Sequence, residues 1–320
     1  MNYQNPDTNS DQEKNILHTF EQITKVIENI EKVIQGKRTV IENVLAALIA
    51  NGHVILLDVP GVGKTLLAKA LAKSIDTHFK RIQFTPDLLP SDITGVNIFN
   101  PKTREFEFQP GPVFTSILLA DEINRSSPKT QSALLEAMEE RQVTIDNVQY
   151  KLPEMFFVIA TQNPIEHAGT YPLPAAQLDR FLMRLSIGYP DAATEKLILN
   201  IHTRDAKPLD ELKSVISASD VIKWQHLANA IYFAPVLDDY LVSLAQATRN
   251  NNPNGHGVSP RATLLLKRVS RAIAILNKRN YVIPDDIRRV IQAVFAHRLV
   301  TGGKVGEAIV EEILSKVNVP

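Results

Sequence analysis

The sequence predicts an α/β fold with a parallel sheet, followed by a domain that consists only of helices. Three observations support this prediction. Up to about residue 190, short apolar runs typical of strands buried on both faces alternate with patterns of helical spacing. One of these runs passes through a glycine turn directly into a helix. After Tyr189 and Pro190 the strand patterns stop, and the remaining chain shows helical spacing alone.

The composition narrows the class of protein. The chain has 320 residues, enough for one large domain or two smaller ones, and it carries 35 basic and 35 acidic residues. This balance argues against strong sequence-independent binding to nucleic acid or to a membrane surface. The absence of cysteine excludes disulfides, thiolate metal sites and cysteine nucleophiles. The polar, acidic start of the chain is unlike a signal peptide, and no apolar run reaches the ~20 residues of a membrane span, so we expect a soluble, cytoplasmic protein without membrane insertion.

Local patterns define the elements of the first domain. Residues 1 to about 12 are polar and are expected to form a disordered tail. Apolar residues at helical spacing predict helices over residues 16–34 and 40–49, each followed by a glycine. Continuous apolar runs predict buried strands with helices between them. The predicted strands cover residues 54–57, 81–84, 116–120 and 155–160, and the helices between them begin near Lys64, Asp87 and Ser127.

Two predicted hairpins interrupt this alternation. The first covers about residues 97–109 and has a basic tip with Lys102 and Arg104. The second covers about residues 141–152 and turns at Asp146 and Asn147. With these inserts, the α/β domain extends over residues 13–190, and a helical domain over residues 191–320. The helices predicted for the second domain cover residues 192–202, 219–232, 236–248, 260–278 and 285–300.

The most informative motif is VILLDVPGVGKT at residues 54–65, a buried strand that leads through a glycine turn into a helix. Backbone N–H groups of such a turn and the positive end of the helix bind phosphate. Lys64 would contact the β- and γ-phosphates, and the Thr65 hydroxyl would hold Mg²⁺. The alternative is an ordinary glycine turn. Asp58 stands where the full motif has glycine, so we expect its carboxylate to point away from the phosphates and to cap the turn locally.

Polar residues follow two further strands. Asp121 and Glu122 end an apolar run, where carboxylates are costly unless they have a function. Asp121 would bind Mg²⁺ through its water shell, and Glu122 would polarise the attacking water; the alternative is a solvated strand end. Asn163 follows the next strand and could bind the γ-phosphate or orient the water. Because asparagine before proline is common in turns, a purely structural role for Asn163 stays open.

The combination of these motifs resembles the AAA+ ATPases, and most closely the MoxR family. The matching segments lie within roughly residues 30 to 310 and read HVILLDVPGVGKTLLAKALA, FQPGPVFTSILLADEINRSSPKTQSALLEAMEERQVTI, FFVIATQNPIEHAGTYPLPAAQLDRFLMR and GVSPRA. The resemblance implies a three-layer α/β nucleotide-binding core with a parallel sheet and an all-α lid domain. It also implies ATP hydrolysis with ATP and Mg²⁺ as ligands.

The resemblance assigns roles to individual residues. Asp121 and Glu122 match Walker B, Asn163 matches sensor 1, Arg180 matches the arginine finger, and Arg261 matches sensor 2. The Walker A loop is expected to hold the nucleotide through Pro60, Gly61, Val62, Gly63, Lys64, Thr65 and Leu66, with Arg261 from the lid and with Gly36 at the adenine.

Some alternatives remain open in this assignment. Arg184 and Arg125 are rivals of Arg180 for the finger role, and Arg180 could instead pair with Asp179 or another nearby acid. Ala175 stands where the family has an acidic residue, which puts one contact between subunits in doubt.

The resemblance further implies a homo-oligomeric ring, a hexamer, in which Arg180 reaches the ATP of the neighbouring subunit. ATP would lie between the core and the lid of its own chain. The implied partner is a protein with a von Willebrand A domain, and the implied activity is chaperone-like remodelling, maturation or metal insertion. Two alternatives belong to other classes. One is a nucleic-acid motor of the minichromosome-maintenance type, which the neutral charge disfavours. The other is a nucleotide-gated binding module with little turnover, which the Asp121–Glu122 pair disfavours.

Overall fold

The predicted parallel sheet forms the centre of the computed structural model, which describes residues 3, 10–163, 170–202, 208–250, 256–299 and 306–320. Its five strands are all parallel and follow the order β2-β5-β8-β1-β9. The strand bounds are β1 Val54–Leu57, β2 Phe79–Gln83, β5 Ile117–Asp121, β8 Phe157–Gln162 and β9 Met183–Leu185. Four of them were predicted. The edge strand β9 was not, because a run of three residues gives too little pattern to recognise.

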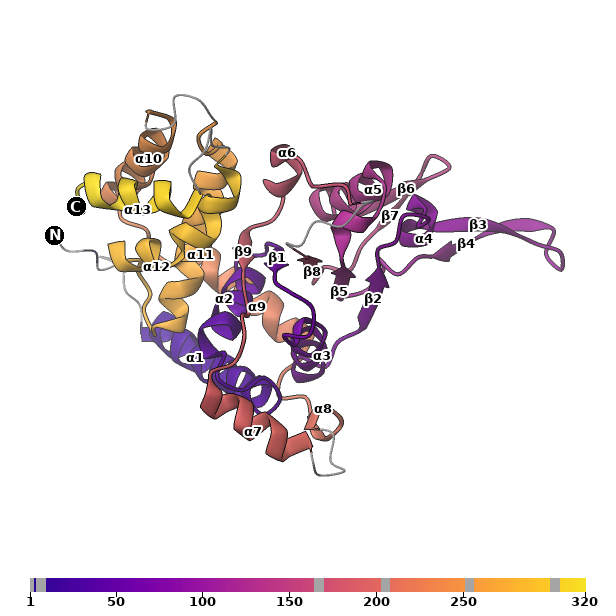
Figure 1. Cartoon of the computed structure of the whole chain (residues 1–320), viewed down its shortest axis with the longest axis horizontal. Helices are drawn as coiled ribbons and strands as arrows, with labels where there is room; N and C mark the ends of the chain where they lie inside the picture. Colours follow the sequence, from indigo (N-terminus) through magenta and orange to yellow (C-terminus); the bar gives the residue numbers. More distant parts are fainter. Residues whose placement is uncertain (1–2, 4–9, 164–169, 203–207, 251–255, 300–305) are drawn as a thin grey trace.

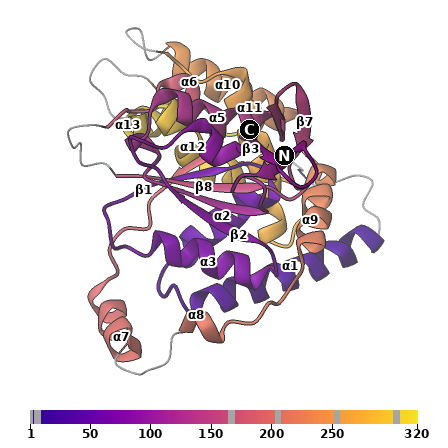
Figure 2. The ribbon, with the colours of Figure 1, turned by 90° about the vertical axis from the view of Figure 1, so that its right-hand side faces the viewer.

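Helices cover both faces of the sheet, which makes three layers (Figure 2). Successive strand residues point to opposite faces. On one face, Leu56 and Leu119 join a core with α1 (Ser10–Glu31), α2 (Arg38–Ile49) and α3 (Lys64–Ser74). On the other face, the buried strand residues pack against α5 and the segments beside it. This second core includes Ile55, Leu118 and Val158 from the sheet and Leu134 and Leu135 from α5 (Pro128–Glu140).

The start of α1 corrects one expectation. The helix begins at Ser10, so residues 10–12 are helical rather than part of a disordered tail. Most of the remaining tail, residues 1–2 and 4–9, lies outside the described residues.

Both predicted hairpins are present. The first pairs β3 (Gly95–Asn100) with β4 (Glu105–Pro110) and projects away from the sheet (Figure 1). The second pairs β6 (Gln142–Ile145) with β7 (Val148–Lys151). Their bases touch, since the Phe108 and Tyr150 rings stack with centroids 3.9 Å apart. The helix before the first hairpin, α4 (Pro90–Thr94), is shorter than the predicted range of 87–94.

After β8, the described residues form helices, the strand β9 and an isolated β-bridge between Tyr232 and Tyr281. A four-residue helix, α6 (Ala175–Leu178), precedes that strand. The helices after it are α7 Ala192–His202, α8 Pro208–Glu211, α9 Ala218–Ala230, α10 Pro235–Asn250, α11 Pro260–Leu276, α12 Pro284–Phe295 and α13 Gly306–Lys316. The five predicted helices are there, whereas α8 and α13 were not predicted. The α12 helix ends earlier than expected and is followed by the 3₁₀ turn η2 (Ala296–Arg298).

The helices α10 to α13 lie together beside α2 and β9 rather than over the sheet (Figure 1). Their apolar residues share one core with α1 and α2. Polar contacts also join α9 to the helices before the sheet. Trp224 Nε1 donates to Gln22 Oε1 of α1 at 3.0 Å, and Gln225 Nε2 donates to the Leu48 carbonyl of α2 at 2.9 Å. The division at residue 190 therefore stays a prediction. None of the described helices combines the length and the apolar character needed to cross a bilayer.

Candidate active site

The glycine loop connects β1 to α3. Gly61 and Gly63 adopt φ angles of 89° and 94°, which residues with a side chain rarely tolerate. Gly63 directly precedes the first turn of α3, where backbone N–H groups lack acceptors within the helix. A Cβ atom on Gly61 would meet nothing within 4 Å. The loop thus offers N–H groups and open space at the positive end of a helix, which suits a phosphate.

A cavity of about 410 Å³ opens over this loop. Because the carboxyl ends of parallel strands meet at one edge of the sheet, residues distant in sequence converge there. The cavity is lined by Pro60, Gly61, Gly63, Lys64, Thr65, Leu66, Arg81, Gln83, Asp121, Glu122 and Asn163. Five predicted residues that carry polar side chains are therefore brought together. The Val62 side chain packs instead against the apolar core.

Lys64 lies across the loop. Its Nζ donates to the backbone carbonyls of Asp58 at 2.6 Å and Val59 at 3.1 Å. Partial burial lowers the pKa of Lys64 below its ordinary value, and the nearby carboxylates of Asp58, Asp121 and Glu122 raise it in opposition.

Asp121 is buried and fully engaged. Its Oδ1 accepts from the Thr161 hydroxyl at 2.6 Å, and its Oδ2 accepts from Arg81 Nη2 at 2.7 Å. The Thr65 hydroxyl and the Glu122 carboxylate line the same cavity. Oxygen atoms of hydroxyl and carboxylate groups are the ligands that Mg²⁺ prefers, so these residues fit that ion.

Glu122 has an unusual backbone. Its φ of 56° and ψ of 49° are left-handed, a conformation that costs a residue with a side chain about 1 kcal/mol or more. The Glu122 N–H donates to Thr161 Oγ1 at 2.8 Å, which holds this conformation. The carboxylate accepts from Gln83 Nε2 at 3.0 Å and from Arg125 Nη1 at 2.9 Å. The strained backbone of Glu122 thus directs its carboxylate into the cavity.

Arg81 and Gln83 are cavity residues that sequence reasoning missed. Both lie on β2, whose register places Gln83 opposite Asp121. The strand itself was predicted. The sequence could not show that β2 neighbours β5 in the sheet, and this pairing is what brings the two side chains to the carboxylates.

The Asp58 carboxylate points away from the phosphate side, as expected, but its role differs from the predicted local cap. It accepts from Ser186 Oγ at 2.7 Å, from the Ile187 N–H at 2.7 Å and from the Gly188 N–H at 3.0 Å. These donors follow β9, 128 or more residues away in the chain. Asp58 therefore anchors the loop to the segment that leaves the sheet.

The change Asp58→Asn should lower the free energy of unfolding by about 2 kcal/mol. Either orientation of the amide turns its NH₂ group toward a backbone N–H or hydroxyl donor and loses a charge-assisted hydrogen bond. Urea denaturation would measure the loss. Asp210→Asn, at an exposed position, is the matched control, with an expected change below about 0.5 kcal/mol. Equal midpoints for the two variants would show that the anchor adds no stability.

Two predicted arginines lie at the opposite edge of the sheet. Arg180 precedes β9, at the edge where the parallel strands begin. Its Nε pairs with Glu139 Oε2 at 3.1 Å, and Arg261 Nη1 pairs with Glu139 Oε1 at 2.5 Å. The four residues of β1 alone place about 13 Å of sheet between this edge and the phosphate loop. Neither arginine lines the cavity. The expectation that Arg261 meets the nucleotide between the core and the lid of its own chain is therefore not met.

The structure also gives the positions of the other arginines and of Gly36. Arg180 does pair with a nearby acid, but this acid is Glu139 rather than Asp179. Arg184 lies in β9 and pairs with Glu307 on α13. Arg125 Nη1 pairs with Glu122 Oε2 at 2.9 Å, beside the cavity of the same chain. Gly36, at φ 69°, lies against Thr194 of α7 and does not line the cavity, so its adenine contact stays a prediction.

Comparisons with known proteins agree with this geometry. The family model described as "ATPase family associated with various cellular activities (AAA)" matches residues 53–183, and the AAA lid domain matches residues 246–315. A crystal structure of a candidate ATPase from Cytophaga hutchinsonii superposes with a TM-score of 0.89 at 39% identity, and the match covers 97% of this chain and 98% of that one.

Named relatives narrow the class further. Chaperone MoxR1 of Mycobacterium tuberculosis is 42% identical over 89% of this chain and 76% of its own length. Protein MoxR of Methylorubrum extorquens is 33% identical over 84% of this chain and 85% of its own length. The uncharacterized protein YeaC of Bacillus subtilis is 51% identical over 92% of this chain and 94% of its own length.

The sheet order, the phosphate loop and the acidic strand end define a nucleotide-binding AAA+ ATPase with a helical lid. Within that class, the relatives named MoxR identify the family. The chain belongs to the MoxR family.

Proposed function

We propose that the protein hydrolyses ATP as a homo-oligomeric ring, a hexamer, in which each nucleotide lies between two protomers. One protomer supplies the phosphate cavity, and the next supplies Arg180 and Arg261. The observation that carries this proposal is the cluster of Arg180, Glu139 and Arg261 at the sheet edge opposite the cavity. Two arginines that cannot reach their own cavity suit a head-to-tail interface, and such interfaces close into rings.

The residues of the cavity then divide the chemistry among them. Glu122 orients the attacking water and takes up its proton, while Asn163 contacts the γ-phosphate. Lys64 leaves the loop carbonyls to pair with β- and γ-phosphate oxygens. Thr65 and Asp121 would hold Mg²⁺, which would neutralise charge on these oxygens.

The arginines of the neighbouring protomer complete the site. Arg180 and Arg261 exchange Glu139 for the γ-phosphate and stabilise the charge that develops during transfer. Hydrolysis therefore depends on assembly of the ring.

The work done by this ring is remodelling of a partner protein. Two relatives carry the name MoxR, one of them as a chaperone, and we propose the same class of activity here, including maturation or metal insertion. A partner with a von Willebrand A domain is our specific proposal. We place the protein in the cytoplasm, where a chain without cysteine is at no disadvantage.

The first hairpin favours a protein partner over nucleic acid. Its exposed side chains include Ile98, Phe99 and Phe106, the last 72% exposed. The basic residues Lys102 and Arg104 are offset by Glu105 and Glu107. Apolar, neutral surfaces bind proteins, whereas a DNA motor needs net positive charge.

A mixing experiment tests the shared site. Rings of Glu122→Gln and rings of Arg180→Ala should each be inactive, whereas a 1:1 mixture should regain activity. In a random mixture about a quarter of the head-to-tail interfaces combine an intact cavity with an intact arginine. Phosphate release measures the recovery, and fluorescence transfer between labelled subunits verifies exchange.

The control mixes Glu122→Gln with Lys64→Ala. Both variants lack the cavity side, so no interface is complete and activity should stay absent. If the first mixture exchanges subunits and stays inactive, Arg180 does not act across the interface.

A further inference from the structure

A buried arginine joins the lid to the segment around Arg180. Arg298 lies in η2 and is only 5% exposed. Its Nε donates to Asp179 Oδ1 at 2.7 Å, and its Nη2 to the Asp179 carbonyl at 3.1 Å. The same guanidinium also donates to the carbonyls of Phe181 and Leu182. It thus holds the backbone on both sides of Arg180.

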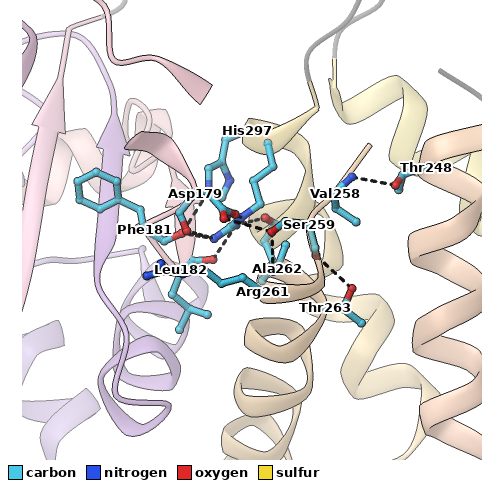
Figure 3. Close-up of polar contacts among 12 residues, drawn as sticks. Asp179, Phe181, Leu182, Thr248, Val258, Ser259, Arg261, Ala262, Thr263 and His297 are labelled. Carbon is cyan, nitrogen blue, oxygen red and sulfur yellow. Dashed lines mark hydrogen bonds and ion pairs between the residues drawn. The ribbon is translucent and has the colours of Figure 1, made fainter. Parts of the chain in front are cut away.

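The second oxygen of Asp179 binds the start of α11. Ser259 Oγ donates to Asp179 Oδ2 at 3.1 Å and accepts from the Ala262 N–H at 3.1 Å, so that it caps the helix. Figure 3 shows Asp179 between Phe181 on the core side and Ser259 on the lid side, with Arg261 beside them. The carboxylate of Asp179, the residue before Arg180, is therefore bound both by Arg298 and by the cap of the helix turn that carries Arg261.

The charge of Arg298 persists in this buried place. Burial lowers the pKa of Arg298 to about 10, while the hydrogen bond and charge of Asp179 raise it. At neutral pH the guanidinium stays protonated, and a buried charge of this kind is retained only with a close partner.

We propose that Asp179 and Arg298 are positioning residues for the ATPase reaction: they lock Arg180 of the core and Arg261 of the lid into one rigid pair for the neighbouring protomer's γ-phosphate. This rests on the proposed function, in which both arginines act across the interface. Rigid placement matters because a shift of about 1 Å in a catalytic group can cost roughly 100-fold in rate. Glu139 contacts both arginines at 3.1 Å and 2.5 Å, so their present spacing already suits a shared anion.

A structural role alone and a positioning role predict different results for Asp179→Asn and Arg298→Lys. Rings of either variant should bind ATP within about threefold of the parent affinity, because both variants leave the residues of the phosphate cavity unchanged. Their turnover should fall by about 10- to 100-fold. Mixed with Glu122→Gln, each variant should regain activity, since the second subunit supplies a well-placed Arg180. Mixed with Arg180→Ala, neither should recover, since both partners lack the same side.

A matched control separates positioning from general weakening of the lid. Asp286 is 2% exposed and pairs with Arg279 at 2.5 Å, wholly within the helical part. Asp286→Asn should lower the unfolding midpoint at least as much as Asp179→Asn and yet keep turnover within about threefold.

The outcomes decide between the proposals. Recovery in the Arg180→Ala plus Glu122→Gln mixture without recovery in either positioning mixture overturns the role of Asp179 and Arg298. Failure of the Arg180→Ala plus Glu122→Gln mixture overturns the shared site, and this inference with it. If Arg298→Lys loses its helical circular dichroism, Asp179→Asn decides alone.

Discussion

Glutamine in place of Glu122 should give a protein that binds ATP with near-normal affinity and hydrolyses it at least about 100-fold more slowly. The change keeps the size of the side chain and its contact with Gln83 but removes the base that the left-handed backbone aims into the cavity. Arg125 then loses its charged partner. Calorimetry with ATP and a phosphate-release assay measure the two quantities separately.

The control for this variant is Glu140→Gln, an exposed position at the end of α5 that should hydrolyse ATP at the parent rate. Turnover of Glu122→Gln within threefold of the parent would remove Glu122 from the chemistry. The cavity would then need another base, and Asp121 is already engaged by Arg81 and Thr161.

Alanine in place of Lys64 should weaken ATP binding by about 100-fold or more. The cavity then keeps the backbone N–H groups of the loop but loses its charge-assisted hydrogen bonds to phosphate, which contribute about 3 kcal/mol. Because Lys64 also bridges the carbonyls of Asp58 and Val59, the loop itself loses two contacts.

Lys69→Ala is the matched control, because Lys69 lies on the same helix and is exposed. Its affinity for ATP should equal that of the parent. Calorimetric titration of both variants checks the pair. An unchanged affinity of Lys64→Ala would contradict a phosphate-binding role for the loop.

Local patterns were enough to predict most of the fold. The buried strands β1, β5 and β8 are continuous apolar runs. The loop after β1 reads GVGKT, a spacing of glycine, lysine and threonine that is typical of phosphate-binding loops. The short edge strand β9 was missed because pairing, rather than its own three residues, makes it a strand. The polar residues that follow β5 and β8 line the same cavity as the phosphate loop because parallel strands all end at one edge of a sheet.

Long-range placement was beyond the sequence. Arg261 was expected near the phosphate loop of its own chain, but it pairs with Glu139 and does not line the cavity. Its position along the chain does not reveal on which side of the sheet the helical part packs. The partners of Asp58 at residues 186–188 were invisible for the same reason, and so was the contact of Arg81 with Asp121. Each of these side chains has a polar head whose partner is fixed by tertiary structure alone.

The anchor of Asp58 has a mechanical consequence. Residues 186–188 follow β9 and lead into α7, the first helix after the sheet. With three hydrogen bonds to this segment, the residue that begins the phosphate loop is joined to the connection between β9 and α7. A shift of Asp58 would break these hydrogen bonds or displace residues 186–188, so the position of the loop and that of the segment before α7 depend on each other through one side chain.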